Sequence, residues 1–336
     1  MKRSPSPAPA WLVADVGGTN VRFALTLPGR PEILVPDSVL ALRVEAFDTP
    51  AAATQHYLDA MGVEPAGAVY AVAGPTDGNT AQLTNHRWSF SAPELRASLG
   101  AQRVMLINDF AAVALAVPAL ADDELSLLGP KAQADRSADL RTFAVVGPGT
   151  GLGVAALTLR QGRPFVLETE GGHASFAPGT PEEVEVLRQL ADRYGRVSWE
   201  RLLCGSGLVN IHRALRETAG QRGDDDLAPE AVTERANTRS DPLCVRAVEL
   251  FCALLGAFAG DLALSFGAWD GVFLAGGLTV PLAPWLEAGE FRRRFEDKGR
   301  FAARMAQVPA ALIRHPHPGL LGAARWVVAN TTRSPA

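Results

Sequence analysis

The chain has 336 residues, of which 47% are hydrophobic and 20% are charged, and its formal net charge is −4. This is the composition of a soluble globular protein with room for one large domain or two ordinary ones, and the acidic balance gives no electrostatic basis for binding nucleic acid or an anionic membrane. Three scattered cysteines without a CxxC spacing exclude a disulfide framework or a zinc knuckle and favour a reducing, cytoplasmic location.

The chain begins with MKRSPSPAPA, in which basic residues are not followed by an apolar segment. A secretory signal requires such a segment, so residues 1–10 are interpreted as a disordered tail. Folded structure is expected from Trp11 onward.

After this tail, predicted strands alternate with inserted helices. Pro50 suits the first turn of one helix, and Ser91-Ala-Pro-Glu94 is a capping box for another that stops at Gly100. Strands are expected at Trp11–Asp15, Val21–Leu27, Glu32–Val44, Ala68–Ala73 and Val104–Ile107, and helices at Pro50–Met61, 91–99 and Phe110–Val117.

A polar stretch from Ala119 to Arg141 is interpreted as a crossover to a second domain. Beyond it, we expect strands and helices at Thr142–Val146, Val154–Leu159, Glu182–Arg193, Ser206–Glu217, Pro229–Ala236, Pro242–Phe266, Gly271–Leu274, Ala311–Ile313 and Gly319–Val328. The longest apolar stretch, Leu243–Phe266, contains charged residues, and its uninterrupted part is too short to span a bilayer. It predicts a buried core helix and no membrane segment, and the mixture of elements predicts an α/β architecture.

Two glycine-rich turns join strand to strand, one in each half of the chain: ADVGGT at Ala14–Thr19 and GPGTGLG at Gly147–Gly153. Dinucleotide-binding and P-loop motifs both open a helix, so neither motif fits these turns. Successive backbone N–H groups and hydroxyls in such turns can bind phosphate oxygens. The alternative interpretation is a pair of ordinary hairpin turns.

Asp15 stands inside the first turn motif. A carboxylate beside a phosphate-binding turn would repel the ligand unless a cation intervened, which favours a Mg²⁺ ion bound directly or through water. The alternative is an aspartate that caps the turn.

Asn108 and Asp109 follow the buried strand Val104–Ile107 and precede a helix. In open α/β sheets this edge is where ligands bind, and an aspartate there is suited to accept a proton during phosphoryl transfer. The alternative is that the pair caps the helix.

A third group, Glu170, His173 and Glu200, supplies hydrogen-bonding groups suited to a polyhydroxylated substrate. His173 could instead be a structural histidine. Gly276 and Gly277 follow another buried strand and would let an adenine or ribose lie against bare backbone.

With these residues assembled, the chain resembles the ATP-dependent bacterial glucokinases of the non-ROK type, in the actin-like ATPase/hexokinase superfamily. The stretches that carry the resemblance run in family order over nearly the whole chain. They are ADVGGTNVRFAL, TNHRWSFS, INDFAAVALAVP, GPGTGLGVAAL, ETEGGHASFAP, ERLLCGSGLVNIHRAL, GVFLAGGL, FEDKGRF and PGLLGAA. Ala14 stands where the family commonly has glycine, CGSG at Cys204 replaces a more usual SGPG, and the zinc-binding cysteine cluster of the neighbouring ROK kinases is missing.

The resemblance implies a two-domain actin-like ATPase/hexokinase (ribonuclease H-like) fold with a cleft, a small α/β domain at residues 11–118 plus 312–330, and a large α/β domain at 119–311. It implies Asp109 as catalytic base and glucose binding by Asn108, Glu170, His173 and Glu200. ATP would contact Ala14, Asp15, Val16, Gly17, Gly18, Thr19, Gly149, Thr150, Gly151, Gly276 and Gly277.

The implied activity is transfer of the γ-phosphoryl group of ATP to the 6-hydroxyl of D-glucose, the first step of glycolysis, with Mg²⁺ as cofactor, in a cytoplasmic homodimer. One alternative is a kinase for another hexose, such as mannose or N-acetylmannosamine, or one that uses polyphosphate as donor. A sugar-sensing regulator is disfavoured because Asp109 is present and no DNA-binding segment precedes Trp11.

Overall fold

The computed structural model describes residues 10–83, 86–129, 138–221 and 227–331, and the chain divides into two compact units. Unit 1 comprises residues 1–121, 162–168 and 315–336, and unit 2 comprises residues 122–161 and 169–314. The expected tail lies outside the described residues apart from Ala10. Each unit is described below by itself.

The main sheet of unit 1 contains β1 (Trp11–Val16), β2 (Asn20–Leu27), β3 (Arg30–Leu34), β4 (Leu40–Arg43), β5 (Gly67–Val72) and β8 (Arg103–Asn108). Its path has the order β3-β2-β1-β5-β8, with β4 paired to β2. Strands β1, β5 and β8 are parallel, and their register aligns Val16 with Val72 and Val72 with Asn108. The carboxyl ends of three neighbouring strands therefore share one edge of the sheet.

The single strand expected over Glu32–Val44 is wrong, because the segment forms β3 and β4 with a 3-10 turn, Pro36–Ser38, between them. Pro36 has no N–H to donate to a ladder and its fixed φ suits a turn, so no single strand runs through this position. The buried Ser38 hydroxyl then fixes the turn, since Oγ donates to the carbonyl of Val35 and accepts the N–H of Leu25.

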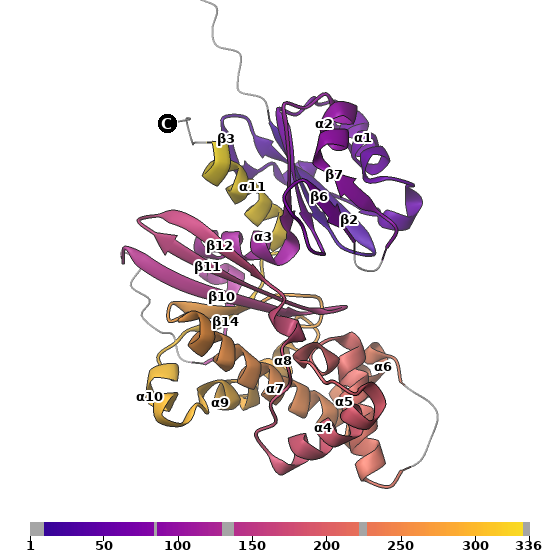
Figure 1. Cartoon of the computed structure of the whole chain (residues 1–336), viewed down its shortest axis with the longest axis vertical. Coiled ribbons are helices and arrows are strands. Elements are labelled where there is room, and N and C mark those ends of the chain that lie inside the picture. The colour runs from indigo at the N-terminus through magenta and orange to yellow at the C-terminus, as the bar shows by residue number, and fades with distance from the viewer. Residues whose placement is uncertain (1–9, 84–85, 130–137, 222–226, 332–336) are drawn as a thin grey trace, which may run out of the picture. The chain divides into compact units, whose positions relative to one another are not determined.

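Helices cover both faces of this sheet (Figure 1). On one face, α1 (Pro50–Met61) and α2 (Ala92–Leu99) bury Tyr57 and Leu95 against strand residues such as Phe23. On the other face, α3 (Asp109–Ala116) and α11 (Pro318–Thr331) pack together. Their approach requires Gly322, because a Cβ there would lie 1.6 Å from the carbonyl oxygen of Ala112.

A second sheet, most of whose strands lie in unit 2, contains β9 (Leu125–Leu127), β10 (Leu140–Pro148), β11 (Leu152–Arg160), β12 (Arg163–Thr169), β13 (Gly271–Leu274) and β14 (Ala310–Ile313), in the order β12-β11-β10-β13-β14-β9. Strand β10 is antiparallel to β11 and parallel to β13. Strand β9 was not predicted, since its three residues lie in the stretch interpreted as a crossover.

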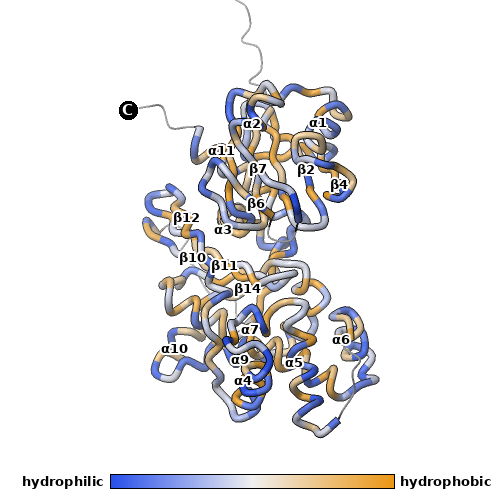
Figure 2. Tube along the Cα trace, turned by 45° about the vertical axis from the view of Figure 1, so that its right-hand side comes forward, coloured by the Kyte–Doolittle hydropathy of each residue, from blue (hydrophilic) through white to orange (hydrophobic). Residues whose placement is uncertain are grey.

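The helices of unit 2 are α4 (Pro181–Tyr194), α5 (Gly205–Thr218), α6 (Pro229–Asn237), α7 (Pro242–Phe266), α8 (Ala283–Glu287), α9 (Glu290–Glu296) and α10 (Ala302–Met305). Helix α7 lies in the core of the unit and packs against α5, α6 and α9. Among the described residues it alone is long and apolar enough to cross a membrane by length and composition, yet 78% of its most apolar window is buried inside the protein. The predicted core helix is confirmed. In Figure 2, by contrast, α4 is largely hydrophilic, as expected for a surface helix.

Candidate active site

The first glycine-rich segment of unit 1 is the strand-turn-strand that the sequence predicts. Gly17, Gly18 and Thr19 connect β1 to the antiparallel β2. The N–H of Gly17 donates to the carbonyl of Asn20 at 3.0 Å, and the carbonyl of Thr19 accepts the N–H of Val44 at 3.0 Å. The turn is thus held at both ends and opens no helix.

Asp15 lies near the carboxyl end of β1, beside the first turn of α11. Its Oδ2 is 4.0 Å from Nη1 of Arg22, its cross-strand neighbour on β2. Burial raises the pKa of Asp15, and the Arg22 guanidinium opposes that rise. A Cβ on Gly319 would lie 2.7 Å from the carboxyl carbon of Asp15, so only glycine leaves room for the carboxylate at this point of α11.

Asn108 and Asp109 lie where β8 ends and α3 begins. The Oδ1 of Asn108 accepts the N–H groups of Phe110 and Ala111 at 2.9 and 3.1 Å, and its Nδ2 donates to the carbonyl of Gly74 at 3.3 Å. Asn108 therefore caps the helix, as the alternative interpretation held. Asp109 occupies the first turn, where the N–H of Phe110 donates to its Oδ1 at 3.0 Å, and the helix dipole stabilises its carboxylate.

One carboxylate beside this pair was not singled out from the sequence. The backbone of Asn108 hydrogen-bonds to Glu168, which lowers the pKa of that side chain, while burial raises it more strongly. The contact joins segments far apart in the sequence, so local spacing gives no signal for it.

The second glycine-rich segment, in unit 2, is a tight hairpin between β10 and β11. Pro148 pairs with Leu152, which leaves Gly149, Thr150 and Gly151 as the loop. The N–H of Gly149 donates to the carbonyl of Gly151 at 2.8 Å, and the carbonyl of Gly149 accepts the N–H of Gly205 at 3.0 Å. We call residues 149–151 the hairpin loop.

Gly276 and Gly277 lie beside this hairpin loop. The N–H of Leu278 donates to the carbonyl of Pro148 at 3.2 Å. Gly276 has φ of +93°, and a Cβ there would lie 2.5 Å from the same carbonyl oxygen, so glycine is required on both counts. The loops that follow the parallel strands β10 and β13 thus lie side by side.

Glu170, His173 and Glu200 come together in unit 2. Nε2 of His173 is 3.9 Å from Oε2 of Glu170, and Nδ1 is 3.8 Å from Oε1 of Glu200. His173 ends a 3-10 turn, η5 (Gly171–His173), whose Gly172 has no room for a side chain because a Cβ would lie 2.3 Å from the carbonyl oxygen of Leu152. The histidine side chain is 57% exposed, so it is not a buried structural residue.

The second oxygen of Glu200 reaches the hairpin. Its Oε2 accepts the N–H of Leu152 at 2.9 Å, directly after the hairpin loop. The set formed by Glu170, His173 and Glu200 is therefore hydrogen-bonded to the second glycine-rich turn within unit 2. In unit 1, one edge of the sheet carries the first glycine-rich turn together with Asp15, Asn108 and Asp109.

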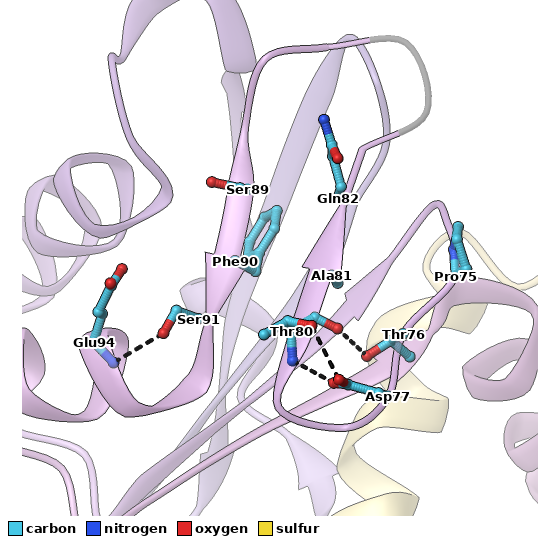
Figure 3. Close-up of a pocket in the computed structure, with 10 residues that line it drawn as sticks. All are labelled: Pro75, Thr76, Asp77, Thr80, Ala81, Gln82, Ser89, Phe90, Ser91 and Glu94. Atoms are coloured by element: carbon cyan, nitrogen blue, oxygen red, sulfur yellow. Dashed lines mark hydrogen bonds between the residues drawn. The ribbon is translucent and has the colours of Figure 1, made fainter.

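A pocket of about 660 Å³ lies elsewhere in unit 1, around the hairpin of β6 (Thr80–Gln82) and β7 (Ser89–Ser91) (Figure 3). None of the predicted site residues lines it. One of its polar groups, Asp77, is engaged beside the hairpin, since its Oδ1 accepts the N–H groups of Asn79 and Thr80 at 2.8 and 2.6 Å and these bonds lower its pKa. We assign it no role in catalysis.

One cluster with metal-ligating atoms is present among the described residues, and it does not suit Mg²⁺. His212, Asp241 and Cys244 each offer an atom within 4.8 Å of the others. Magnesium prefers oxygen ligands, whereas this set offers one carboxylate, an imidazole and a thiol. That carboxylate already caps α7, and burial raises the pKa of the Cys244 thiol to about 12.

Comparisons with known proteins show the family to which the chain belongs. The family model "Glucokinase" matches residues 12–330. A glucokinase of Stenotrophomonas maltophilia (strain R551-3) is 50% identical over 316 residues, which cover 94% of each chain. The crystal structure of a glucokinase from an Antarctic psychrotroph has a TM-score of 0.85 at 34% identity and covers 95% of this chain and 98% of its own.

A more distant structure supports the fold. The glucokinase of Balamuthia mandrillaris, solved in complex with glucose, has a TM-score of 0.78 at 24% identity and covers 97% of this chain and 95% of its own. These matches confirm the predicted actin-like ATPase/hexokinase fold. The chain belongs to the glucokinase family of ATP-dependent hexose kinases.

Proposed function

We propose that this kinase transfers the γ-phosphoryl group of ATP to the 6-hydroxyl of D-glucose with Asp109 as the base. The observation that carries this assignment is the place of Asp109, at the carboxyl edge shared by β1, β5 and β8, the same edge at which the first glycine-rich turn begins. A carboxylate there can orient the sugar hydroxyl and accept its proton while the phosphoryl group moves.

The sugar is bound by Asn108, Glu170, His173 and Glu200. Glu170 and Glu200 flank the imidazole of His173 on its two nitrogen sides, which gives a set of acceptors and a donor for neighbouring hydroxyls. A site built to hydrogen-bond hydroxyls rejects analogues that lack the matching hydroxyl, because the protein groups are then left unpaired.

The nucleotide is bound by the two glycine-rich turns, Ala14–Thr19 and the hairpin loop, and by Gly276 and Gly277. Backbone N–H groups in these turns are fixed before the ligand arrives, so they stabilise charge on the phosphates with little reorganisation. Asp15 fits a Mg²⁺ ion bound to those phosphates, since burial disfavours its charged form and a cation would restore it. When bound, Mg²⁺ neutralises phosphate charge.

The test is Asp109→Asn, which keeps the shape of the side chain but removes its basicity. We expect kcat to fall by about 10²–10⁴-fold, because a positioned general base contributes that much, while the affinity for glucose changes little. Asp48→Asn serves as the matched control, because Asp48 is an exposed carboxylate of unit 1 paired with Arg87. Near-wild-type turnover by Asp109→Asn in a coupled assay of glucose 6-phosphate would show that another group is the base.

We further propose a cytoplasmic homodimer. The three cysteines are free and buried, as suits a reducing compartment. Sedimentation equilibrium would give twice the 35.5 kDa of one chain, and a mass of 35.5 kDa at micromolar concentration would contradict the dimer. Cell fractionation tests the location.

A further inference from the structure

The carboxylate of Glu200 faces in two directions. One oxygen is 3.8 Å from the imidazole of His173, in the group that we assign to the sugar. The other accepts the N–H of Leu152 at 2.9 Å, in the strand that leaves the hairpin loop assigned to phosphate. The carboxylate of Glu200 therefore belongs both to the proposed sugar site and to the proposed phosphate site of unit 2.

The backbone that carries Glu200 is held firmly. Glu200 lies in the 3-10 turn Trp199–Arg201, and the N–H of Trp199 donates to the carbonyl of Ala174 at 3.0 Å. The buried Trp199 ring lies between Phe176 and Phe258, at centroid distances of 5.0 and 4.9 Å. The carboxylate is therefore presented from a packed position and can act as a fixed anchor for the hairpin.

The hairpin loop has room for the Glu200 carboxylate because residue 151 is glycine. A Cβ on Gly151 would lie 2.6 Å from Oε2 of Glu200, so a side chain at this position would push the carboxylate away. At the other end of the loop, the carbonyl of Gly149 accepts the N–H of Gly205. The loop is thus tied at both ends to the segment 200–205, and Glu200 supplies the one tie made by a side chain among these contacts.

We propose that Glu200 is a positioning residue for the hairpin loop and that it couples sugar binding to nucleotide binding. The proposal rests on the proposed function, which places hexose and phosphate at these two sites. A sugar hydroxyl that donates to the carboxylate fixes the rotamer in which Oε2 holds Leu152, so the loop is ordered for phosphate. By linkage, nucleotide must raise the affinity for sugar by the same factor as sugar raises the affinity for nucleotide.

The decisive measurement is the affinity for ADP in the absence of any sugar, by titration calorimetry. A residue that only binds glucose would leave this affinity unchanged. We expect Glu200→Ala to weaken ADP by about ten-fold, the loss of one hydrogen bond to a charged acceptor. Glu200→Gln keeps an oxygen that can accept from Leu152, so it should retain ADP affinity within about three-fold of wild type.

Glu170→Ala is the matched control, because it removes the other carboxylate that faces His173. It should weaken glucose while sugar-free ADP affinity stays as in wild type. Circular dichroism and thermal melts check that each variant is folded.

Gly151→Ala gives a second measurement, and the single substitution in the wild-type background remains measurable even where Glu200→Ala misfolds. In the wild-type background the added methyl displaces Glu200 and should weaken ADP, whereas in the Glu200→Ala background most of that loss should vanish. Additive losses would mean that the two residues act independently.

The proposal would be overturned if Glu200→Ala bound ADP as tightly as wild type. It would also be overturned if Glu170→Ala lost as much sugar-free ADP affinity as Glu200→Ala. Failure of the proposed function shows itself differently, as absence of ATP-dependent phosphorylation of glucose by the wild-type enzyme. The glucose-induced gain in ADP affinity, present in wild type and lost in Glu200→Ala, completes the test.

Discussion

Gly319 leaves room for the Asp15 carboxylate at the edge of unit 1 that we assign to nucleotide binding. It lies in the first turn of α11, where a Cβ would sit 2.7 Å from the carboxyl carbon of Asp15 and 2.9 Å from Oδ2. Alanine is a better helix former than glycine by about 1 kcal/mol, so the helix itself would favour the larger residue. The glycine is therefore explained by Asp15 and not by the helix.

We expect Gly319→Ala to push the Asp15 carboxylate from its place and to lower kcat/KM for ATP in the presence of Mg²⁺ by about ten-fold, a loss of about 1.4 kcal/mol. The KM for glucose should change little. Steady-state kinetics over a range of Mg²⁺ concentrations measures both quantities. An unchanged kcat/KM would show that the position of Asp15 is unimportant to the nucleotide.

At the scale of elements, the sequence predicts the ends of α2, because Ser91 caps the helix and Gly100 ends it in a left-handed conformation, as the capping box and the glycine indicate. Pro50 lies in the first turn of α1, as expected, and the side chain of Thr49 caps that helix. Such signals are local, so the sequence contains them completely. The same holds for the strand-turn-strand character of both glycine-rich turns.

Asp241 provides a measurable case of such a cap. It begins α7, the long core helix of unit 2, and its Oδ1 accepts the N–H groups of Leu243 and Cys244 at 2.9 and 3.3 Å. Asp241→Ala should lower the free energy of unfolding by about 1–2 kcal/mol. Asp241→Asn keeps the accepting oxygen and should lose much less. Equal losses in urea denaturation would mean that the carboxylate stabilises the unit through its charge, since Nη1 of Arg235 lies 3.8 Å from Oδ2.

Other elements and contacts could not be predicted, because tertiary contacts determine them. Strands β6, β7 and β9 have three residues each and exist through their partners in the sheet, so no periodicity marks them. Likewise, the residue types of Glu170, His173 and Glu200 suggested sugar binding. Their spacing around one imidazole, however, depends on the approach of η5 to the turn Trp199–Arg201, which are far apart in sequence.

At the scale of the whole molecule, the free energy of unfolding depends on pH in the alkaline range, because two tyrosine hydroxyls are buried. Burial raises the pKa of Tyr57, whose hydroxyl donates to the carbonyl of Ser38, to about 12, and burial also raises the pKa of Tyr70. In the unfolded chain tyrosine ionises near pH 10. Between about pH 10 and 12 the unfolded state loses protons that the native state keeps, so the free energy of unfolding falls as pH rises.

Tyr57→Phe removes one of these groups. We expect it to be less stable than wild type at pH 7, because the carbonyl of Ser38 loses its donor. Its free energy of unfolding should nevertheless fall less steeply above pH 10. Urea denaturation at a series of pH values measures the slope, and parallel curves for the two proteins would contradict the assignment of the pKa shift.

Unit 1 is formed by three separate stretches of the chain, and this affects how it folds during synthesis. Its sheet face beneath α11 is completed by Leu320, Ala323, Ala324 and Val327, which are fully buried, yet these residues are synthesised after the whole of unit 2. Domains fold as their residues emerge from the ribosome. A growing chain therefore carries an uncovered apolar face, formed by residues such as Val13 and Val69, until α11 emerges. During this interval the nascent protein is most prone to aggregate.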